Sequence, residues 1–253
     1  AYLHHPDLLR NRTQEEIHED LKWAARLAFW VASGEKDGGW SYTCPGYEGE
    51  LTRDVPKRSE YMWERTVDRD GVAGVARFPV PPALPAFRPS DRWWNDHSNS
   101  QYAVLGLKAA SNLGIRMPPE LWVRVAEHWL SFQEKEGAEV SLQTRQEPGR
   151  REYRPRTVDA RAGGWNYNGS NAPPHVFSGS MTVAGLAVAR VCLDEVEGNR
   201  ELRDRLEVAI RDGWGWMQAN YSVERNPPAI SNMYYYFYWP ICLKRGKPLS
   251  RWI

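Results

Sequence analysis

Hydrophobic residues recur at helical spacing in three stretches of the chain. The first begins with the capping box Thr13-Gln-Glu-Glu16, and its apolar positions continue on one face as far as Gly34. The second runs from Pro118 to about Gly137, and the third begins at Glu201. Each stretch has one apolar and one polar face, which predicts three amphipathic helices that cover a core on one side and meet water on the other.

A second series of segments is apolar on nearly all sides. The segment "NSQYAVLGLKAA" at 99–110 aligns without a gap with "SGSMTVAGLAVA" at 178–189, which places Gly106 over Gly185. The segment "SNMYYYFYWPICL" at 231–243 occupies the corresponding place after the third amphipathic stretch. Helices of this kind are expected to be enclosed by neighbours, and their aligned small residues should allow those neighbours to approach closely.

The alternation of enclosed and half-exposed helices predicts an all-α fold. An α/α toroid, a barrel of helical hairpins with an inner and an outer ring, accounts for it, and a helical solenoid would show a similar alternation. We expect a single domain over residues 1–253, with no competing strand pattern. The proline-rich segment 43–95 and the arginine-rich segment 138–177 are expected to be long irregular loops.

Composition excludes some partners and leaves others open. The 33 basic residues balance 32 acidic ones, so the chain lacks the charge excess typical of nucleic-acid binding. No apolar run reaches about 18 residues, so we do not expect an integral membrane protein. The compartment stays open, because a removed signal peptide would leave no trace in this chain. The 13 Trp and 12 Tyr residues either fill layers between helices or line a cavity.

Four motifs together resemble a known family. These are "DGGWSYTCPG" at 37–46, "DHSNSQYAVLGLKAA" at 96–110, "SGSMTVAGL" at 178–186, and "NYSVERNP" with "MYYYFY" between 220 and 238. Their order is similar to that in bacterial proteins with prenyltransferase and squalene oxidase repeats, within the squalene cyclase and protein prenyltransferase superfamily. The resemblance implies an α/α toroid. With only about six helices in the chain, it also implies a fragment or a partial, open ring.

The resemblance also locates the position at which catalytic groups would stand. In squalene cyclases an Asp-x-Asp-Asp-Thr acid motif begins an inner helix, and in prenyltransferases an Asp-x-Cys pair binds zinc there. Here Asp96 matches the first aspartate, but Ser98 replaces the second aspartate or the cysteine, and Asn99 replaces the third carboxylate. Serine and asparagine supply neither a strong acid nor a soft zinc ligand. We therefore expect no metal and no cofactor, and Asp96 and His97 remain the candidates for catalysis.

The polar cluster at the start of this helix has two interpretations. Its side chains either cap the helix or form the polar rim of a ligand cavity. The aromatic residue after each Gly-Gly pair, Trp40 or Trp165, is best explained as a clamp that packs over a helix end. The ligand-binding candidates are Asp96, His97, Asn99, Gln101, Tyr102, Trp165, Tyr167, Tyr235 and Tyr238.

These observations favour a non-catalytic protein. It would bind an apolar, isoprenoid or carbohydrate ligand, or a protein partner, through a central cavity and long loops. The alternatives are an α/α-barrel enzyme of the polysaccharide lyase or hydrolase kind, in which Asp96, His97 or Tyr102 would act as general acid or base, and a terpenoid cyclase with an altered acid motif.

Overall fold

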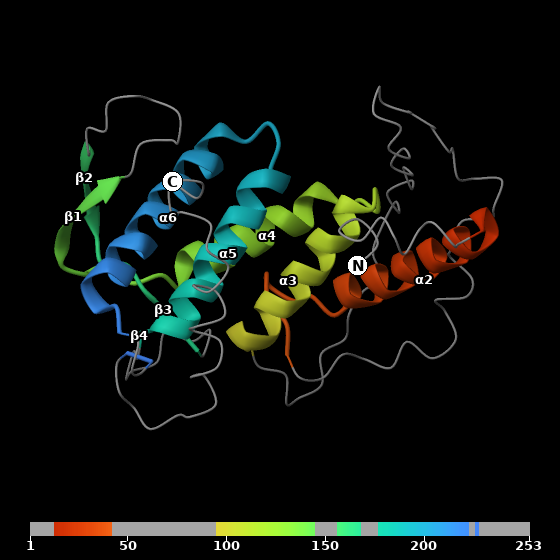
Figure 1. Ribbon diagram of the computed structural model, residues 1–253, viewed down its shortest axis with the longest axis horizontal. Helices are drawn as coiled ribbons and strands as arrows, with labels where there is room; N and C mark the ends of the chain where they lie inside the picture. Colours follow the sequence, from red (N-terminus) through yellow and green to blue (C-terminus); the bar gives the residue numbers. More distant parts are fainter. Residues whose placement is uncertain (1–12, 42–94, 145–155, 168–176, 223–225, 228–253) are drawn as a thin grey trace.

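The computed structural model describes residues 13–41, 95–144, 156–167, 177–222 and 226–227. Within these ranges the helices are α2 (Gln14–Ser33), α3 (His97–Asn112), α4 (Pro119–Ser131), α5 (Gly179–Glu195) and α6 (Arg200–Asn220) (Figure 1). The strands are β1 (Glu139–Thr144), β2 (Arg156–Arg161), β3 (Trp165–Asn166) and β4 (Phe177–Ser178). They form two antiparallel pairs, β1 with β2 and β3 with β4.

The helix boundaries follow local signals in the sequence. The capping box at the start of α2 is confirmed, because Thr13 Oγ1 accepts from the Glu16 N–H and the Glu16 carboxylate accepts from the Thr13 N–H. Gly34 ends this helix, as predicted. Helix α4 ends at Ser131, short of the predicted end near Gly137, because the chain then pairs Gln133 with β3. The third near-apolar segment, 231–243, lies outside the described residues.

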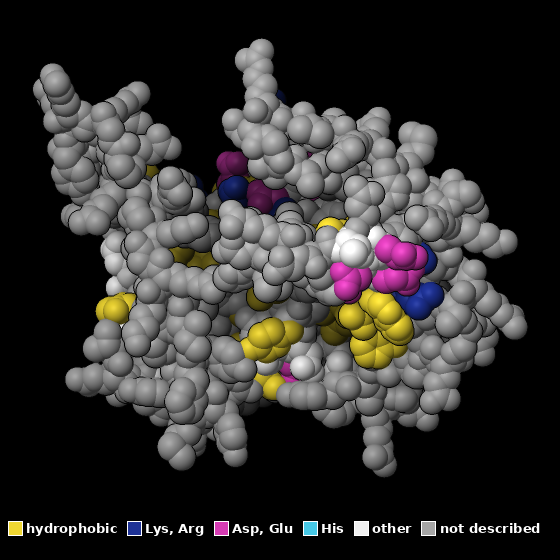
Figure 2. Space-filling view, turned by 45° about the vertical axis from the view of Figure 1, so that its right-hand side comes forward, with side chains coloured by type: hydrophobic (Ala, Val, Ile, Leu, Met, Phe, Trp, Pro, Cys, Tyr) yellow, Lys and Arg dark blue, Asp and Glu magenta, His cyan; other side chains and the backbone are white. Residues whose placement is uncertain are grey.

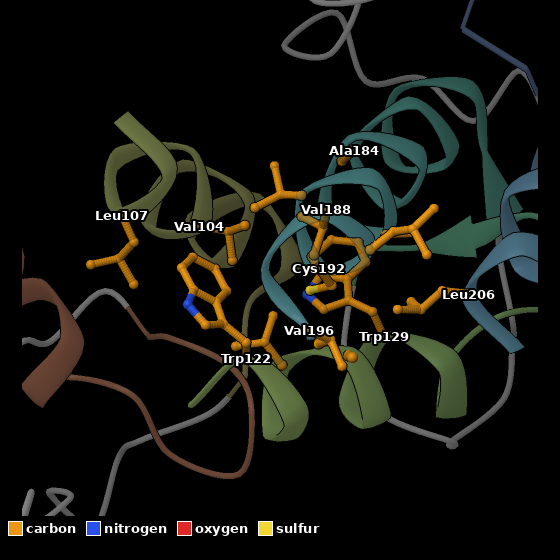
Figure 3. Close-up of a cluster of buried hydrophobic side chains, with 14 of the residues drawn as sticks. Val104, Leu107, Trp122, Trp129, Ala184, Val188, Cys192, Val196 and Leu206 are labelled. Carbon is orange, nitrogen blue, oxygen red and sulfur yellow. The ribbon is translucent and has the colours of Figure 1, made fainter. Parts of the chain in front are cut away.

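The helices lie side by side along the longest axis of the molecule (Figure 1). Helix α2 packs on α3, α3 packs on α5, and α5 contacts α4 and α6. Side chains from four helices meet in one core, where Trp122 and Trp129 of α4 lie against Val104 of α3, Val188 of α5 and Leu206 of α6 (Figure 3). Full burial of one such side chain contributes about 1.5–3 kcal/mol to folding, so this core is the main source of stability.

The prediction of an all-α toroid is wrong, because the described residues include two small antiparallel sheets beside the helices. The larger sheet, β1 with β2, lies in the segment 138–177 that was expected to be an irregular loop. Its register pairs Val140 with Ala160 on one face, and Glu139 with Arg161 on the other. The period-2 alternation of a half-buried hairpin is present in "EVSLQT" and "RTVDAR", but the surrounding charges obscure it.

Candidate functional site

The first Gly-Gly-Trp motif connects helix α2 to the start of α3. The Trp40 indole Nε1–H donates to the carbonyl of Val31 in α2 at 2.7 Å. The backbone N–H of Trp40 donates to Ser100 Oγ in α3 at 2.9 Å. Trp40 is buried, so both bonds are shielded from water. The predicted clamp is confirmed at this motif.

The second Gly-Gly-Trp motif repeats both bonds. The Trp165 indole donates to the carbonyl of Trp129 in α4 at 2.8 Å, and its backbone N–H donates to Thr182 Oγ1 in α5 at 3.2 Å. Trp165 is fully buried, and its ring occupies the space beside Gly185, where an added Cβ would lie 2.2 Å from it. The clamp is confirmed here too, and Trp165, a predicted ligand contact, is a core residue.

These contacts define how the two near-apolar helices correspond. Asp96 caps α3 and Ser178 caps α5, and the hydroxyls of Ser100 and Thr182, each four residues after its cap, accept from the tryptophans. The structural correspondence is therefore an offset of 82 positions, whereas the gapless sequence alignment used an offset of 79. Gly106 and Gly185 are not equivalent, and the close approach predicted for both glycines is wrong at Gly106, whose added Cβ would meet no described residue within 4 Å.

Asp96 is the residue that caps α3. Its Oδ1 accepts from the Asn99 N–H at 2.8 Å, and its own N–H donates to the carbonyl of Trp40 at 3.0 Å. Ser100 Oγ donates to the carbonyl of Asp96 at 2.7 Å. The side chain of Asp96 is buried, and its Oδ2 has no hydrogen-bond partner among the described residues. A single aspartate thus provides the cap, and His97 and Ser100 make other contacts.

His97 is fully buried at the start of α3, with contacts at both ring nitrogens. Its Nδ1 lies 2.8 Å from the carbonyl oxygen of Asn166 in β3, and its Nε2 lies 3.1 Å from His128 Nε2 in α4. The ring stacks on Trp129 at a centroid distance of 4.4 Å and an interplanar angle of 24°, and it meets the edge of Phe132. His97 therefore joins α3, α4 and β3 at one buried point.

The hydrogen-bond partners assign the protons on this histidine pair. Because a carbonyl oxygen can only accept, His97 carries its proton on Nδ1 and leaves Nε2 as an acceptor. The contact between the two rings then needs the proton of His128 on Nε2, and the side-chain Nδ2 of Asn95 lies 3.0 Å from that nitrogen and 3.3 Å from His128 Nδ1. This assignment gives each of the two contacts of the His97 ring nitrogens one proton while both imidazoles are neutral.

Burial keeps both imidazoles neutral well below neutral pH. Loss of hydration lowers the pKa of His97 to about 4, although the hydrogen bond to Asn166 and the charge of Asp96 act in the opposite direction. Loss of hydration, together with the neighbouring His97, lowers the pKa of His128 to about 3. A general acid or base is most effective when its pKa lies near the working pH, so neither ring is suited to acid–base catalysis at pH 7.

Three members of this site were absent from the sequence-based prediction. His128 lies on the buried face of α4, between Val125 and Phe132 at helical spacing, and this position was the available signal. No pattern in the sequence indicated Asn95 or Asn166. Asn95 takes part through its side-chain amide, and Asn166 takes part through its backbone carbonyl. Only the tertiary arrangement brings these two next to the histidines.

The other predicted ligand contacts are dispersed. Tyr102 is 46 % exposed on α3, whereas Asn99 and Gln101 are partly buried near its start. The carbonyl of Tyr167 accepts from the backbone N–H of His97 at 3.2 Å. Tyr235 and Tyr238 lie outside the described residues. Of the predicted set, the structure thus brings together Asp96, His97 and the backbone of Tyr167.

The described residues offer few other reactive groups. No three His, Cys, Asp or Glu side chains among them come together in a way that could hold a metal ion. Cys192 is fully buried in α5, and burial raises the pKa of its thiol, which makes it a poor nucleophile. None of the described helices is long and apolar enough to cross a membrane.

A surface hollow of about 560 Å³ lies between the β1–β2 hairpin and α6. It is lined by residues 139–141 and 159–161 of the hairpin and by Val208, Arg211 and Asp212 of α6. It shares no residue with the histidine pair, so the site predicted at the start of α3 and this hollow are separate. Comparison of the chain with protein-family models, curated proteins and solved structures found no match.

Proposed function

We propose that this protein is a non-catalytic binding protein. The observation that supports this most directly is the state of the histidine pair: His97 and His128 are buried, neutral, and bonded to each other and to the surrounding chain. Asp96, the other catalytic candidate, is used as a helix cap. Asp96 and His97, the two main candidates for acid–base chemistry, are therefore engaged in structural contacts.

The hollow between the hairpin and α6 is the binding surface that we propose. Its volume is within the range typical of ligand sites, about 300–1,000 Å³. It carries the guanidinium groups of Arg161 and Arg211, which are 51 % and 38 % exposed, beside the carboxylates of Glu139, Asp159 and Asp212. Charges of both signs favour a polar partner, either a carbohydrate or a segment of another protein, over an apolar isoprenoid.

The experiment compares binding with turnover on one panel of compounds. Purified protein is incubated with squalene, polyprenyl diphosphates and an oligosaccharide panel, and products are analysed by mass spectrometry while binding is followed by calorimetry. We expect binding of a polar compound without any product. Turnover that is lost in Asp96→Asn or His97→Asn would contradict the proposal and favour a lyase, a hydrolase or a cyclase.

The location of the site is tested separately with arginine variants. For the compound that binds, Arg161→Ala and Arg211→Ala should each weaken affinity about tenfold, corresponding to about 1.4 kcal/mol. Arg190→Ala is the matched control, because Arg190 is 43 % exposed, between the values for Arg161 and Arg211, but lies on α5 and pairs with Asp194. An equal loss in all three variants would show that the hollow is not the binding surface.

A further inference from the structure

The histidine pair holds together segments that are far apart in the sequence. His97 begins α3, His128 lies within α4, and the carbonyl of Asn166 belongs to β3. The side-chain Nδ2 of Asn95, just before α3, lies 3.0 Å from His128 Nε2 and 3.3 Å from its Nδ1. Breaking this set of contacts would therefore release the start of α3 from α4 and β3 at the same time.

An additional proton disturbs the contact at the centre of this pair. His97 can take a proton only on Nε2, and that N–H would point at the N–H of His128 from 3.1 Å away. Two donors face each other in that state unless the proton of His128 moves to Nδ1, and in both cases the pair carries a buried positive charge. Because His97 is fully buried, water cannot accept the proton in place of His128.

The charged and polar neighbours compensate only partly for a positive charge on the pair. Asp96 is the charged side chain that favours protonation of His97, and the backbone of Asp37 provides a hydrogen bond that favours protonation of His128. The remaining ring contacts are with Trp129 and Phe132, which carry no charge. When the contact opens, both imidazoles reach water and bind protons near their ordinary pKa of about 6.5.

We propose that the histidine pair is an acid-sensitive switch, in which protonation opens the contact between the start of α3 and α4 while α5 and α6 stay folded. Opening of one region without the rest is a common form of local unfolding. Acid favours the open state, because the pKa is lowered to about 4 for His97 and to about 3 for His128 only while the contact is closed. The closed contact is therefore fully stable above about pH 6.5, and its stability is lost as the pH falls towards those lowered pKa values.

Amide hydrogen exchange of the full chain at pH 7.5 and pH 5.0, corrected for the intrinsic exchange rate, tests the switch. The backbone N–H groups of Asp96, His97 and Asn99 bond to other segments or to the cap. Their protection should fall about 30-fold for each histidine that takes up a proton on opening. The amides within α6 should change less than threefold. A uniform loss in all helices, or no loss at the start of α3, would overturn the proposal.

Variants that cannot be protonated give the second readout. His128→Gln keeps an amide donor near the position of Nε2, and His97→Asn keeps a donor to Asn166. Each should reduce the pH dependence of exchange at the start of α3, and the double variant should remove it. Glu207→Gln, at an exposed position of α6, should behave as wild type. Persistence of the full pH dependence in the double variant would also overturn the proposal. If the variants are unfolded at pH 7.5, the wild-type exchange pattern decides.

Discussion

At the scale of single residues, two buried hydroxyl groups determine how the chain enters the near-apolar helices. Ser100 and Thr182 are both fully buried, and each accepts a hydrogen bond from the backbone N–H of a clamp tryptophan. A tryptophan N–H that lost this acceptor would be buried without a partner. The free-energy cost of such an unsatisfied donor is greater than the net gain from a typical hydrogen bond.

Replacing one hydroxyl by a methyl group should reveal this cost. Thr182→Val keeps the shape of the side chain but leaves the Trp165 N–H unsatisfied, so we expect the free energy of unfolding to fall by about 1–3 kcal/mol. Urea denaturation followed by circular dichroism measures the change. Thr157→Val on the exposed side of β2 is the control and should stay within about 0.5 kcal/mol of wild type.

The candidate site was predictable only in part at this scale. The polar side chains before α3 indicated a cap, and Asp96 provides it, because capping is a local interaction. The partners of His97 lie 31 and 69 positions further along the chain. Periodicity places His128 on a buried face, but it cannot show that the face meets His97. The chemistry of the pair therefore depends on tertiary packing that no local pattern contains.

At the scale of elements, the two near-apolar helices differ in how closely they approach their neighbours. A Cβ at Gly185 in α5 would lie 2.2 Å from the Trp165 ring, whereas a Cβ at Gly106 in α3 would meet nothing within 4 Å in the part of the chain that the structure describes. Gly106 is exposed and Gly185 is buried. The glycine in α5 is thus required for packing, and the glycine in α3 is not.

The two glycines form a matched pair for mutagenesis. Gly185→Ala should displace the Trp165 ring and lower the free energy of unfolding by about 1–3 kcal/mol. Gly106→Ala should raise it by about 0.5–1 kcal/mol, because alanine has the higher helix propensity and the site has room. Thermal and urea denaturation of both variants measure the two changes. Equal destabilisation would contradict the packing described for α3.

Ion pairs tie the successive amphipathic helices to one another. Arg124 of α4 binds Glu35 at the end of α2, and Arg205 of α6 binds Glu127 of α4. The two pairs differ in burial, because the Glu35 side chain is 5 % exposed and the Glu127 side chain is 46 % exposed. Glu35 also accepts from the Gly38 N–H at 2.7 Å. The first pair therefore has the larger structural role.

Replacing each arginine by glutamine distinguishes the ion pair with the buried carboxylate from the exposed ion pair. Arg124→Gln leaves a buried carboxylate without its charged partner, so we expect a loss of about 1.5–3 kcal/mol in the free energy of unfolding. Arg205→Gln breaks an exposed pair and should cost less than about 1 kcal/mol, with part of the effect screened by salt. Urea denaturation at low and high ionic strength distinguishes them. A larger loss in Arg205→Gln would contradict the burial of Glu35.

At the scale of the whole molecule, the sequence predicted the helices better than their assembly. The capping box, the glycine at the end of α2 and the helical periodicity are local signals, and they gave correct helices. The β1–β2 hairpin, which packs on α6 at one end of the molecule (Figure 1), was missed because its alternation is short and rich in charge. The all-α prediction failed for that reason.

The surface of the molecule adds to this picture. Hydrophobic side chains reach it in separate patches (Figure 2), and Trp23 and Leu27 on α2 are each 58 % exposed. These two residues stand four positions apart and therefore share one face of α2. The hollow beside the hairpin is lined by several charges instead. A polar partner at that hollow is therefore a better fit to the molecule than an apolar one.

The state of the histidine pair tests the central claim most directly. Long-range ¹H–¹⁵N correlation spectra of the ¹⁵N-labelled protein at pH 7 report the charge and the tautomer of each imidazole. We expect both rings to be neutral, with the proton of His97 on Nδ1 and that of His128 on Nε2, as their partners require. A charged ring, or a His97 that titrates between pH 6 and 7, would contradict the assignment of this pair to structure and would favour a catalytic role.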